Sequence, residues 1–304
     1  MEGLNKCKME MKQLNYRVNI YFNCGVFRLG KNMNLSDVSE MISNASDALI
    51  DAANMEEKGN HIAHYDSKMA KARFYENHMV TAISEALDQG SLSMMYKQIV
   101  NLSGNKILGF YLEISMDTLE ISNEEMYRVI KRKNLVPQIE KYMLRMAYSE
   151  LRLFNNETKA YPRLFIPVSK ETLEERYLEA IQTHEKFYKI NPKYIVFVVD
   201  SIYNTPLAQL KNTNYTLASK DIFDVYRGLC DYLIYDYHGV NLETVPEILD
   251  LCKKHNVEVI LSNMNEKEDI DIARENGYQY IFGNFYNKRF RMKDLLKGIK
   301  KDKS

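Results

Sequence analysis

The sequence predicts an α/β protein, and three observations lead to this class. Short apolar strand patterns alternate with amphipathic helical patterns from residue 163 to the C-terminal region. The run YIVFVV (194–199) is almost continuously apolar, as parallel strands buried on both faces are. The 304 residues allow one barrel of about 200–250 residues with a smaller attachment. Repeated βα units of this kind indicate a (β/α)₈ barrel or a doubly wound sheet.

The first 66 residues predict a small β-α-β piece. Residues 17–29 are rich in β-branched and aromatic residues and predict a strand. The helical pattern after it has Ser36 as its candidate N-cap and Gly59 just past its end, and residues 61–65 predict a short strand. Because a piece of this size buries little apolar area alone, we expect it to pack on the barrel or on a second copy of the chain.

A connecting helix is predicted over residues 67–90. Asp66 or Ser67 can cap its start and Gly90 can end it. Its apolar pattern does not last for three heptads, which favours a helix packed on the next domain over a free coiled coil. One helical face carries the apolar residues Tyr75, Met79, Ile83 and Ala86.

The remaining chain opens with two strand patterns, 94–102 and 106–114, joined by a hairpin turn signal, SGN. Helices are predicted around 122–133 and 137–155, with Pro137 suited to a first helical turn. An opening hairpin is unusual for a βα barrel. Further strands are predicted at 163–169, 194–200, 215–218, 231–236, 257–262 and 280–285.

The bulk composition excludes several classes of protein. Lys+Arg and Asp+Glu both total 41, so no overall positive field draws the chain to nucleic acid or anionic lipid. No run of about 18 apolar residues predicts a membrane span, and the N-terminal residues lack an apolar signal core. The four cysteines form no CxxC pair, which is typical of reduced thiols in the cytoplasm. We expect a cytoplasmic protein with no nucleic-acid partner.

The strand order with its opening hairpin resembles the EAL domain, the cyclic di-GMP phosphodiesterase barrel. The stretch YKQIVNLSGNKILGFYLEI (96–114) matches that family's Q-P-I-V strand, hairpin and G-x-E-A-L strand. The segment before it resembles the last part of a GGDEF (diguanylate cyclase) domain, through NCG (23–25) and ASDAL (45–49). The GGDEF signature would lie upstream of Met1, so no cyclase activity is expected.

The resemblance implies a fold and three parts of the chain. The fold is a TIM-type (β/α)₈ EAL-like barrel with an opening antiparallel strand, plus a small N-terminal α/β GGDEF-like piece. Residues 1–66 would be the partial GGDEF-like segment, 67–90 the connecting helix and 91–304 a degenerate EAL-like barrel.

The resemblance also implies where the catalytic glutamate of E-A-L would lie. Aligned on Gly109, that position is Tyr111, and Glu113 falls on the leucine of the motif. Shifting Glu113 into the glutamate position would slip the strand by two residues, about 6.6 Å, whereas a metal site tolerates about 0.2 Å. We therefore interpret Glu113 as an ordinary strand residue. The arginine that follows E-A-L in the family is Ser115 here.

Most of the other functional positions that the resemblance implies have also changed. The asparagine of V-N-x-S is Pro167, and the metal-binding glutamate of E-x-T-E is Val198. The paired aspartates of D-D-F-G are Lys220 and Asp221, in a shortened loop.

The motif positions in the last strands of the barrel have mostly changed as well. The lysine of K-x-D is Ile234, while its aspartate remains as Asp236. The glutamate of E-G-V-E is Ser262, and the glutamine of Q-G is Phe282, with Gly283 retained. Only Asp221 and Asp236 keep their chemistry. A nearby candidate, His238, has no nucleophile or base beside it in sequence.

Hydrolysis of the phosphodiester would use two divalent cations held by carboxylates and an asparagine. Lys220 would place an ammonium where a ligand should lie and could pair with Asp221 or Asp236. We therefore expect no metal, no cofactor and no enzyme activity. The favoured interpretation is a non-catalytic module that acts through protein association as a homodimer. The alternatives are an inactive barrel that binds cyclic di-GMP as a sensor and an active phosphodiesterase.

Overall fold

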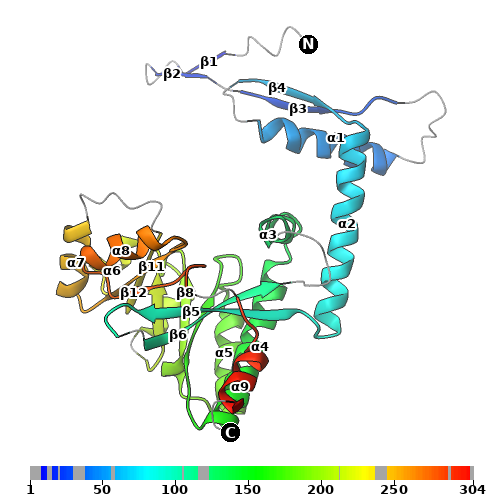
Figure 1. The fold of residues 1–304 in the computed structure, drawn as a ribbon. Helices are drawn as coiled ribbons and strands as arrows, with labels where there is room; N and C mark the ends of the chain where they lie inside the picture. The colour runs from blue at the N-terminus through cyan, green and yellow to red at the C-terminus, as the bar shows by residue number, and fades with distance from the viewer. Residues whose placement is uncertain are drawn as a thin grey trace. The chain divides into compact units, whose positions relative to one another are not determined.

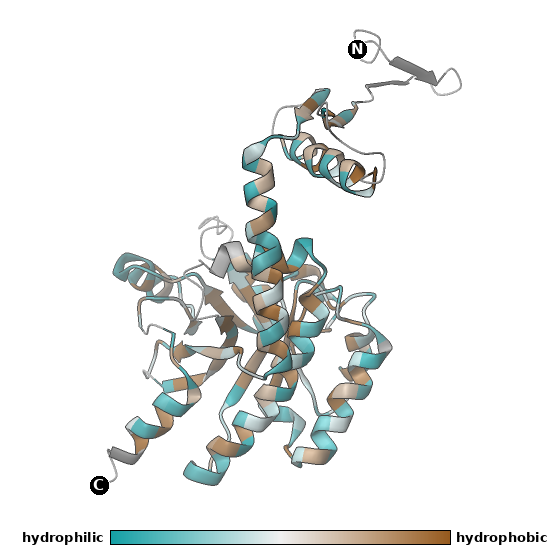
Figure 2. Cartoon of the chain, turned by 90° about the vertical axis from the view of Figure 1, so that its right-hand side faces the viewer, coloured by the Kyte–Doolittle hydropathy of each residue, from teal (hydrophilic) through white to brown (hydrophobic). Residues whose placement is uncertain are grey.

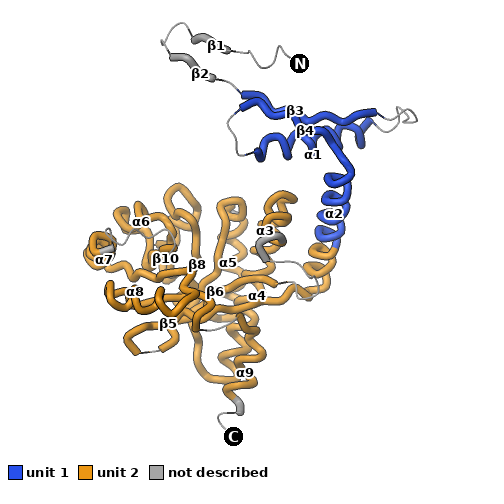
Figure 3. The backbone as a smooth tube through the Cα atoms, turned by 45° about the horizontal axis from the view of Figure 1, so that its top comes forward, with its two compact units in different colours: residues 1–81 blue, residues 82–304 orange. Residues whose placement is uncertain are grey.

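The chain divides into two compact units, residues 1–81 and 82–304 (Figure 3). The boundary falls within the long helix α2 (Ser67–Asp88). None of the helices in the described part of the chain is long and apolar enough to cross a membrane. The computed structural model describes residues 8–11, 16–19, 21–29, 38–55, 59–104, 106–115, 123–211, 213–236, 245–286 and 289–301.

Unit 1 contains two small two-stranded sheets. β1 (Lys8–Met11) pairs with β2 (Tyr16–Asn19) antiparallel, and β3 (Asn23–Val26) pairs with β4 (His61–His64) parallel. The strand predicted over 17–29 is wrong as a single element. Its two halves pair with different strands, β1 and β4, and the Phe22 N–H donates to Asn60 Oδ1 at 2.7 Å instead of joining a ladder.

Helix α1 (Val38–Ala53) packs closely on the β3–β4 sheet. Gly25 allows this approach, because a Cβ atom there would lie 2.0 Å from the carbonyl oxygen of Ala45. The small core consists of Ala48, Ala52 and Ala63 with Tyr65 and Met69 packed against it. The predicted N-cap of this helix, Ser36, lies outside the described residues.

The predicted connecting helix is present as α2. Asp66 caps it, since its Oδ1 accepts hydrogen bonds from the backbone N–H groups of Lys68 and Met69, both at 2.9 Å. Gly90, with φ of 65°, follows its end as predicted. Tyr75 is 48% exposed, so the apolar face is not continuous toward the N-terminal half of the helix.

Unit 2 is built around a closed barrel in the strand order β10-β11-β12-β5-β6-β7-β8-β9 (Figure 1). β5 runs antiparallel to both of its neighbours, β6 and β12, whereas the other pairs are parallel. This confirms the predicted barrel with an opening antiparallel strand. The strands are β5 (Ser93–Asn101), β6 (Lys106–Ser115), β7 (Arg163–Pro167), β8 (Ile195–Val199), β9 (Thr216–Ser219), β10 (Tyr232–Asp236), β11 (Glu258–Ser262) and β12 (Tyr280–Ile281).

Helices lie outside the strands, and the long α4 begins with Pro137 in its first turn, as predicted. Figure 2 shows the barrel strands as largely hydrophobic, whereas the surrounding helices carry both hydrophobic and hydrophilic residues. The helices are α3 (Asn123–Arg132), α4 (Val136–Thr158), α5 (Glu175–Tyr188), α6 (Ile222–Tyr226), α7 (Val245–Lys254), α8 (Lys267–Glu275) and α9 (Met292–Lys301), with short 3₁₀ turns η3 (Pro192–Tyr194) and η4 (Pro206–Leu210).

The strand predicted over 280–285 is only two residues long. Gly283 lies against β11's following loop, where a Cβ atom would meet the carbonyl oxygen of Met264 at 2.0 Å. The chain therefore leaves the ladder after Phe282, whose N–H still donates to Leu261 O at 2.9 Å. Gly109 has a similar role in β6, because a Cβ atom there would lie 2.5 Å from Arg163 O on β7.

The barrel interior is filled by side chains, as in small closed barrels. Three of the sequence-predicted site positions, Val198, Ile234 and Phe282, belong to this interior cluster and are almost fully buried. Tyr111 packs against it from β6. The other members are Ile99, Phe165, Val196, Ala218, Tyr232 and Ile260.

Candidate functional site

Two adjoining cavities open at the carboxyl ends of the parallel strands, where barrel enzymes place their active sites. The larger, of about 730 Å³, lies between β5, β6, α3 and α4; we call it the lateral pocket. The smaller, of about 430 Å³, lies over β10, β11 and Phe282; we call it the central pocket. Both are lined by Lys97, Tyr111, Glu113 and Asn263, so they form one mouth.

The position expected for the catalytic glutamate holds a stacked aromatic pair. The rings of Tyr111 and Phe282 lie 4.7 Å apart between centroids with an interplanar angle of 18°. Burial raises the pKa of the Tyr111 hydroxyl well above its ordinary value, so this group stays neutral. The pair closes the apolar barrel interior at the floor of the mouth and leaves no carboxylate there.

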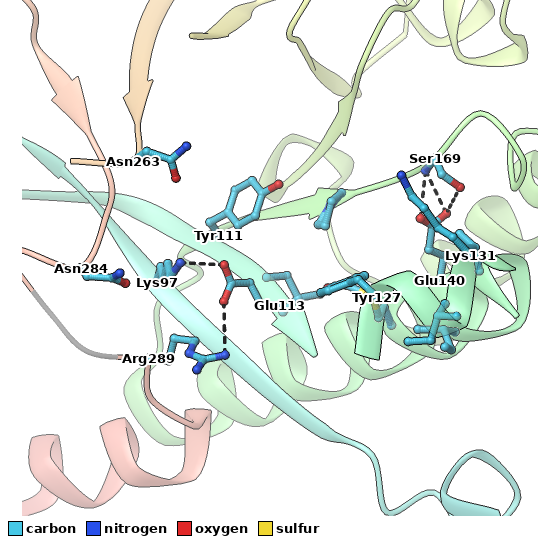
Figure 4. Close-up of a pocket in the computed structure, with 16 residues that line it drawn as sticks. Lys97, Tyr111, Glu113, Tyr127, Lys131, Glu140, Ser169, Asn263, Asn284 and Arg289 are labelled. Carbon is cyan, nitrogen blue, oxygen red and sulfur yellow. Dashed lines mark hydrogen bonds and ion pairs between the residues drawn. The ribbon is translucent and has the colours of Figure 1, made fainter. Parts of the chain in front are cut away.

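Glu113 lies beside this pair and is engaged by two cations (Figure 4). Its Oε1 lies 2.9 Å from Lys97 Nζ on β5, and its Oε2 lies 3.9 Å from a guanidinium nitrogen of Arg289. The Glu113 and Lys97 side chains are only 19% and 17% exposed. A carboxylate that already neutralises two nearby cations is a poor ligand for a divalent metal ion, since the cations would repel it.

Asp221 serves as a helix cap. Its Oδ1 accepts a hydrogen bond from the Phe223 N–H at 2.9 Å at the start of α6, and its Oδ2 accepts one from the Ser201 hydroxyl at 3.0 Å. Lys220 pairs with Asp200 at 2.9 Å, rather than with Asp221 or Asp236 as considered from sequence. The reason is that Asp221 faces α6, while the Lys220 N–H bonds to Val199 O and brings its side chain next to Asp200.

Asp236 and Ser262 face each other in the β10–β11 register at the edge of the central pocket. Asp236 Oδ2 accepts a hydrogen bond from the Asn263 side-chain amide at 2.9 Å, and the Ser262 hydroxyl donates to Tyr235 O at 3.3 Å. Pro167 lines the lateral pocket without a side-chain donor or acceptor. Among the described residues, no three His, Cys, Asp or Glu side chains gather closely enough to hold a metal ion. His238 lies outside those residues.

Two carboxylates, one buried and one half-buried, were not singled out from the sequence. Asp224 in α6 is fully buried and accepts hydrogen bonds from the N–H groups of Ile202 at 2.6 Å and Tyr203 at 3.2 Å, and from the Ser219 hydroxyl at 2.6 Å. Through these hydrogen bonds Asp224 connects the segment after β8 with the end of β9. Its place three residues after the capping Asp221 was the only sequence signal.

The second is Glu140, at the far end of the lateral pocket. Its oxygens accept hydrogen bonds from the Ser169 N–H at 3.0 and 2.9 Å and from the Ser169 hydroxyl at 3.0 Å. Burial raises the pKa of the Glu140 carboxyl, although the hydrogen bonds from Thr172 and Ser169 oppose that rise. Tyr127 lies between this end of the pocket and Glu113 (Figure 4). Its hydroxyl forms a hydrogen bond with the backbone of Ile114.

Sequence reasoning also missed Lys97 and Arg289, which line the same pocket. Lys97 pairs in register with Tyr111, so strand alternation could have placed it on the inner face. No local signal marks Arg289, which reaches the pocket from the segment between β12 and α9.

The closed barrel with its single antiparallel strand is of the EAL type, and comparisons with known proteins agree. Residues 80–218 match the family model of the EAL domain. A comparison with curated protein sequences found no match.

Several solved structures are similar in fold. The EAL enzyme Bd1971, in its form with cAMP and cyclic di-GMP, aligns over 78% of this chain and 72% of its own, with 14% identity and a TM-score of 0.65. The FimX EAL domain of Xanthomonas citri, in complex with c-diGMP, aligns over 73% and 97%, with 12% identity and a TM-score of 0.60. An EAL domain protein from Listeria monocytogenes EGD-e aligns over 72% and 96%, with 16% identity and a TM-score of 0.58.

Proposed function

We propose that the chain is a non-catalytic EAL-domain module of cyclic di-GMP signalling, which acts through protein association. The observation that carries this proposal is the Tyr111–Phe282 stack at the position of the catalytic glutamate. Phe282 has no oxygen and the buried Tyr111 hydroxyl stays neutral, so the pair offers no anionic oxygen to a metal ion. Because Val198 and Ile234 are also buried in that core, restoring a ligand set would require remodelling the barrel floor.

The remaining carboxylates at the barrel mouth already form hydrogen bonds or ion pairs within the protein. Two-metal hydrolysis needs several oxygen ligands around two cations about 3.5–4 Å apart. Asp221 caps α6, Asp236 accepts from Asn263 and Glu113 pairs with Lys97 and Arg289. These interactions support a site without the metal pair that the reaction would need.

The test is a phosphodiesterase assay of the purified chain with cyclic di-GMP and Mn²⁺ or Mg²⁺. We expect no linear dinucleotide above a boiled control, and calorimetry with Mn²⁺ should give no two-site binding. Turnover that Asp236→Asn abolishes would overturn the proposal, because it would show that the residual carboxylates still perform catalysis.

The second part of the proposal is that the chain associates as a homodimer. We also propose that residues 1–66 are a GGDEF-like remnant. Parallel sheets are normally covered on both faces, and two strands alone are marginal in water. In unit 1, α1 covers one face of the β3–β4 pair, yet Ile62 on β4 and Ile42 on α1 remain 40% and 62% exposed. These exposed apolar side chains favour an interaction surface, and we propose that its partner is a second copy of the chain.

Sedimentation over a wide concentration range tests the homodimer. We expect a dimer at high micromolar concentration that Ile62→Asp weakens, whereas Leu153→Asp, at a similarly exposed position on unit 2, leaves it unchanged. A strict monomer of the unmodified chain would refute the dimer and leave the catalytic part of the proposal intact.

A second candidate is a sensor that binds cyclic di-GMP without hydrolysing it. Bd1971 and FimX have been solved in complex with that dinucleotide, and the mouth of this barrel is open. These two observations favour the sensor as an alternative. Titration of the chain with cyclic di-GMP in the presence of a chelator separates the two candidates, since only the sensor binds.

A further inference from the structure

The lateral pocket combines an apolar wall with an excess of positive charge. Buried side chains of α3 and α4, Ile130, Ile139 and Met143 among them, form one wall. Such a volume, lined mainly by apolar groups with a few polar ones, is typical of small-molecule sites. The pocket is therefore suited to a ligand with an apolar body.

The charges in this pocket do not balance. Three cations, Lys97, Lys131 and Arg289, face two carboxylates, Glu113 and Glu140, which leaves a net charge of +1. Charges that are partly withdrawn from water are normally paired, because desolvation of an unpaired charge is unfavourable. An anion in the pocket would supply the missing partner.

The two cations nearest Glu113 share that one carboxylate. At 3.9 Å, the contact of Arg289 is an ion pair at long range, and within the described part of the chain its guanidinium donates no hydrogen bond. A guanidinium has five N–H donors in a planar fork that matches the oxygens of a phosphate or carboxylate. Arg289 is thus placed at the pocket with its donors available.

Lys131, on α3, lies at the Glu140 end of the pocket (Figure 4). It is exposed, and it forms no ion pair among the residues that the structure describes. Glu140 lies at the same end of the pocket as Lys131 and accepts hydrogen bonds from Ser169 (Figure 4). The cations that share one carboxylate are therefore Lys97 and Arg289, at the Glu113 end.

We propose that the lateral pocket binds an organic phosphate monoester directly through Lys97 and Arg289, with its apolar body on the wall formed by α3 and α4. A phosphate monoester carries a charge of about −1.5 to −2 at neutral pH and three strong acceptor oxygens, so it supplies the missing negative charge and acceptors for both the Lys97 ammonium and the Arg289 guanidinium. A carboxylate has only two oxygens, and Glu113 already leaves Arg289 at 3.9 Å. The inference rests on the proposed absence of a metal pair, because the cations replace metal ions in neutralising the phosphate.

Calorimetric titration of the full chain in a chelator tests this, with phenyl phosphate as the probe and phenol and inorganic phosphate for comparison. We expect phenyl phosphate to bind, and phenol and inorganic phosphate each to bind about tenfold more weakly or worse, since each lacks one of the two matched features. Absence of phenyl phosphate binding at millimolar concentration would overturn the inference.

Two arginine variants give the matched comparison. Arg289→Gln should weaken phenyl phosphate binding about tenfold or more, the usual effect of losing a hydrogen bond to a charged group. Arg274→Gln removes an exposed guanidinium that pairs with Asp271 on α8, away from the pocket, and should leave affinity unchanged. Equal loss in both variants would show a general charge effect and overturn the site. Unchanged melting temperatures confirm that both variants fold.

The outcome is distinguishable from that of the proposed function. Metal-dependent hydrolysis of cyclic di-GMP would refute the non-catalytic proposal whatever phenyl phosphate does. Absence of both hydrolysis and phenyl phosphate binding would refute only the phosphate site.

Discussion

Two corners of the same barrel mouth hold carboxylates in opposite circumstances. At the β9–α6 corner, Asp221 and Asp224 accept hydrogen bonds from groups close by in the fold and are saturated. In the lateral pocket, one carboxylate, Glu113, faces two cations from distant segments and leaves them short of acceptors. The difference teaches that an acidic residue at a barrel mouth is often structural, whereas incomplete pairing indicates a site that can accept a ligand.

Asp224→Ala should have the largest effect on stability. It leaves two backbone N–H groups and the Ser219 hydroxyl without an acceptor in a fully buried place, which we expect to lower the free energy of unfolding by about 3–5 kcal/mol. Urea denaturation measures it, with the exposed Asp250→Ala as control. A loss similar to that of the control would mean that this corner is not saturated by Asp224.

Glu113→Gln should separate the two corners in function. Lys97 is mostly buried and would lose its charged partner, so we expect the free energy of unfolding to fall by about 1–3 kcal/mol. Phenyl phosphate should bind more tightly in the same variant, because the anion no longer competes with a carboxylate for Lys97 and Arg289. Weaker binding on calorimetric titration would contradict the assignment of Glu113 as a counter-ion.

Asp221→Ala should have a moderate effect. It removes the N-cap of α6 and the acceptor for the Ser201 hydroxyl, and loss of a cap lowers the free energy of unfolding by about 1 kcal/mol. Asp221→Asn, which keeps an oxygen acceptor, is the conservative comparison and should recover most of the loss. If Asp221→Ala instead changed Mn²⁺ binding with stability intact, the residue would be a ligand and not a cap.

The smallest expected effect is a pH dependence at Glu150, away from both corners. Burial raises the pKa of this carboxyl, which accepts a hydrogen bond from the Tyr96 hydroxyl. The folded chain thus binds the proton more tightly than the unfolded chain, and the stability that Glu150 contributes is fully present below its ordinary pKa and is lost as pH rises through the raised value.

Glu150→Gln keeps an acceptor oxygen without titrating. Relative to the unmodified chain, it should therefore gain stability as pH rises above the ordinary pKa of a glutamate carboxyl, as denaturation at a series of pH values would show. The exposed Glu179→Gln on α5 is the control and should show no such trend. An opposite trend for Glu150→Gln would mean that the carboxylate is stabilised by its surroundings.

The sequence by itself determined the features that local chemistry controls. Alternating apolar patterns gave the barrel strands, the SGN turn gave the β5–β6 hairpin, and Asp66, Gly90 and Pro137 marked helix ends correctly. These predictions succeed because capping, turn formation and strand alternation depend on residues within a few positions of each other. Changed residue types at Tyr111, Val198 and Ile234 were likewise visible without a structure.

Only the tertiary structure decided which side chains meet. Closure of the barrel stacks Tyr111 on Phe282, and the segment before α9 brings Arg289 to Glu113. The same reason explains the misjudged strand at 17–29, whose halves find different partners, and the pairing of Lys220 with Asp200. Contacts between segments far apart in the chain depend on strand register and loop path, which no local pattern specifies.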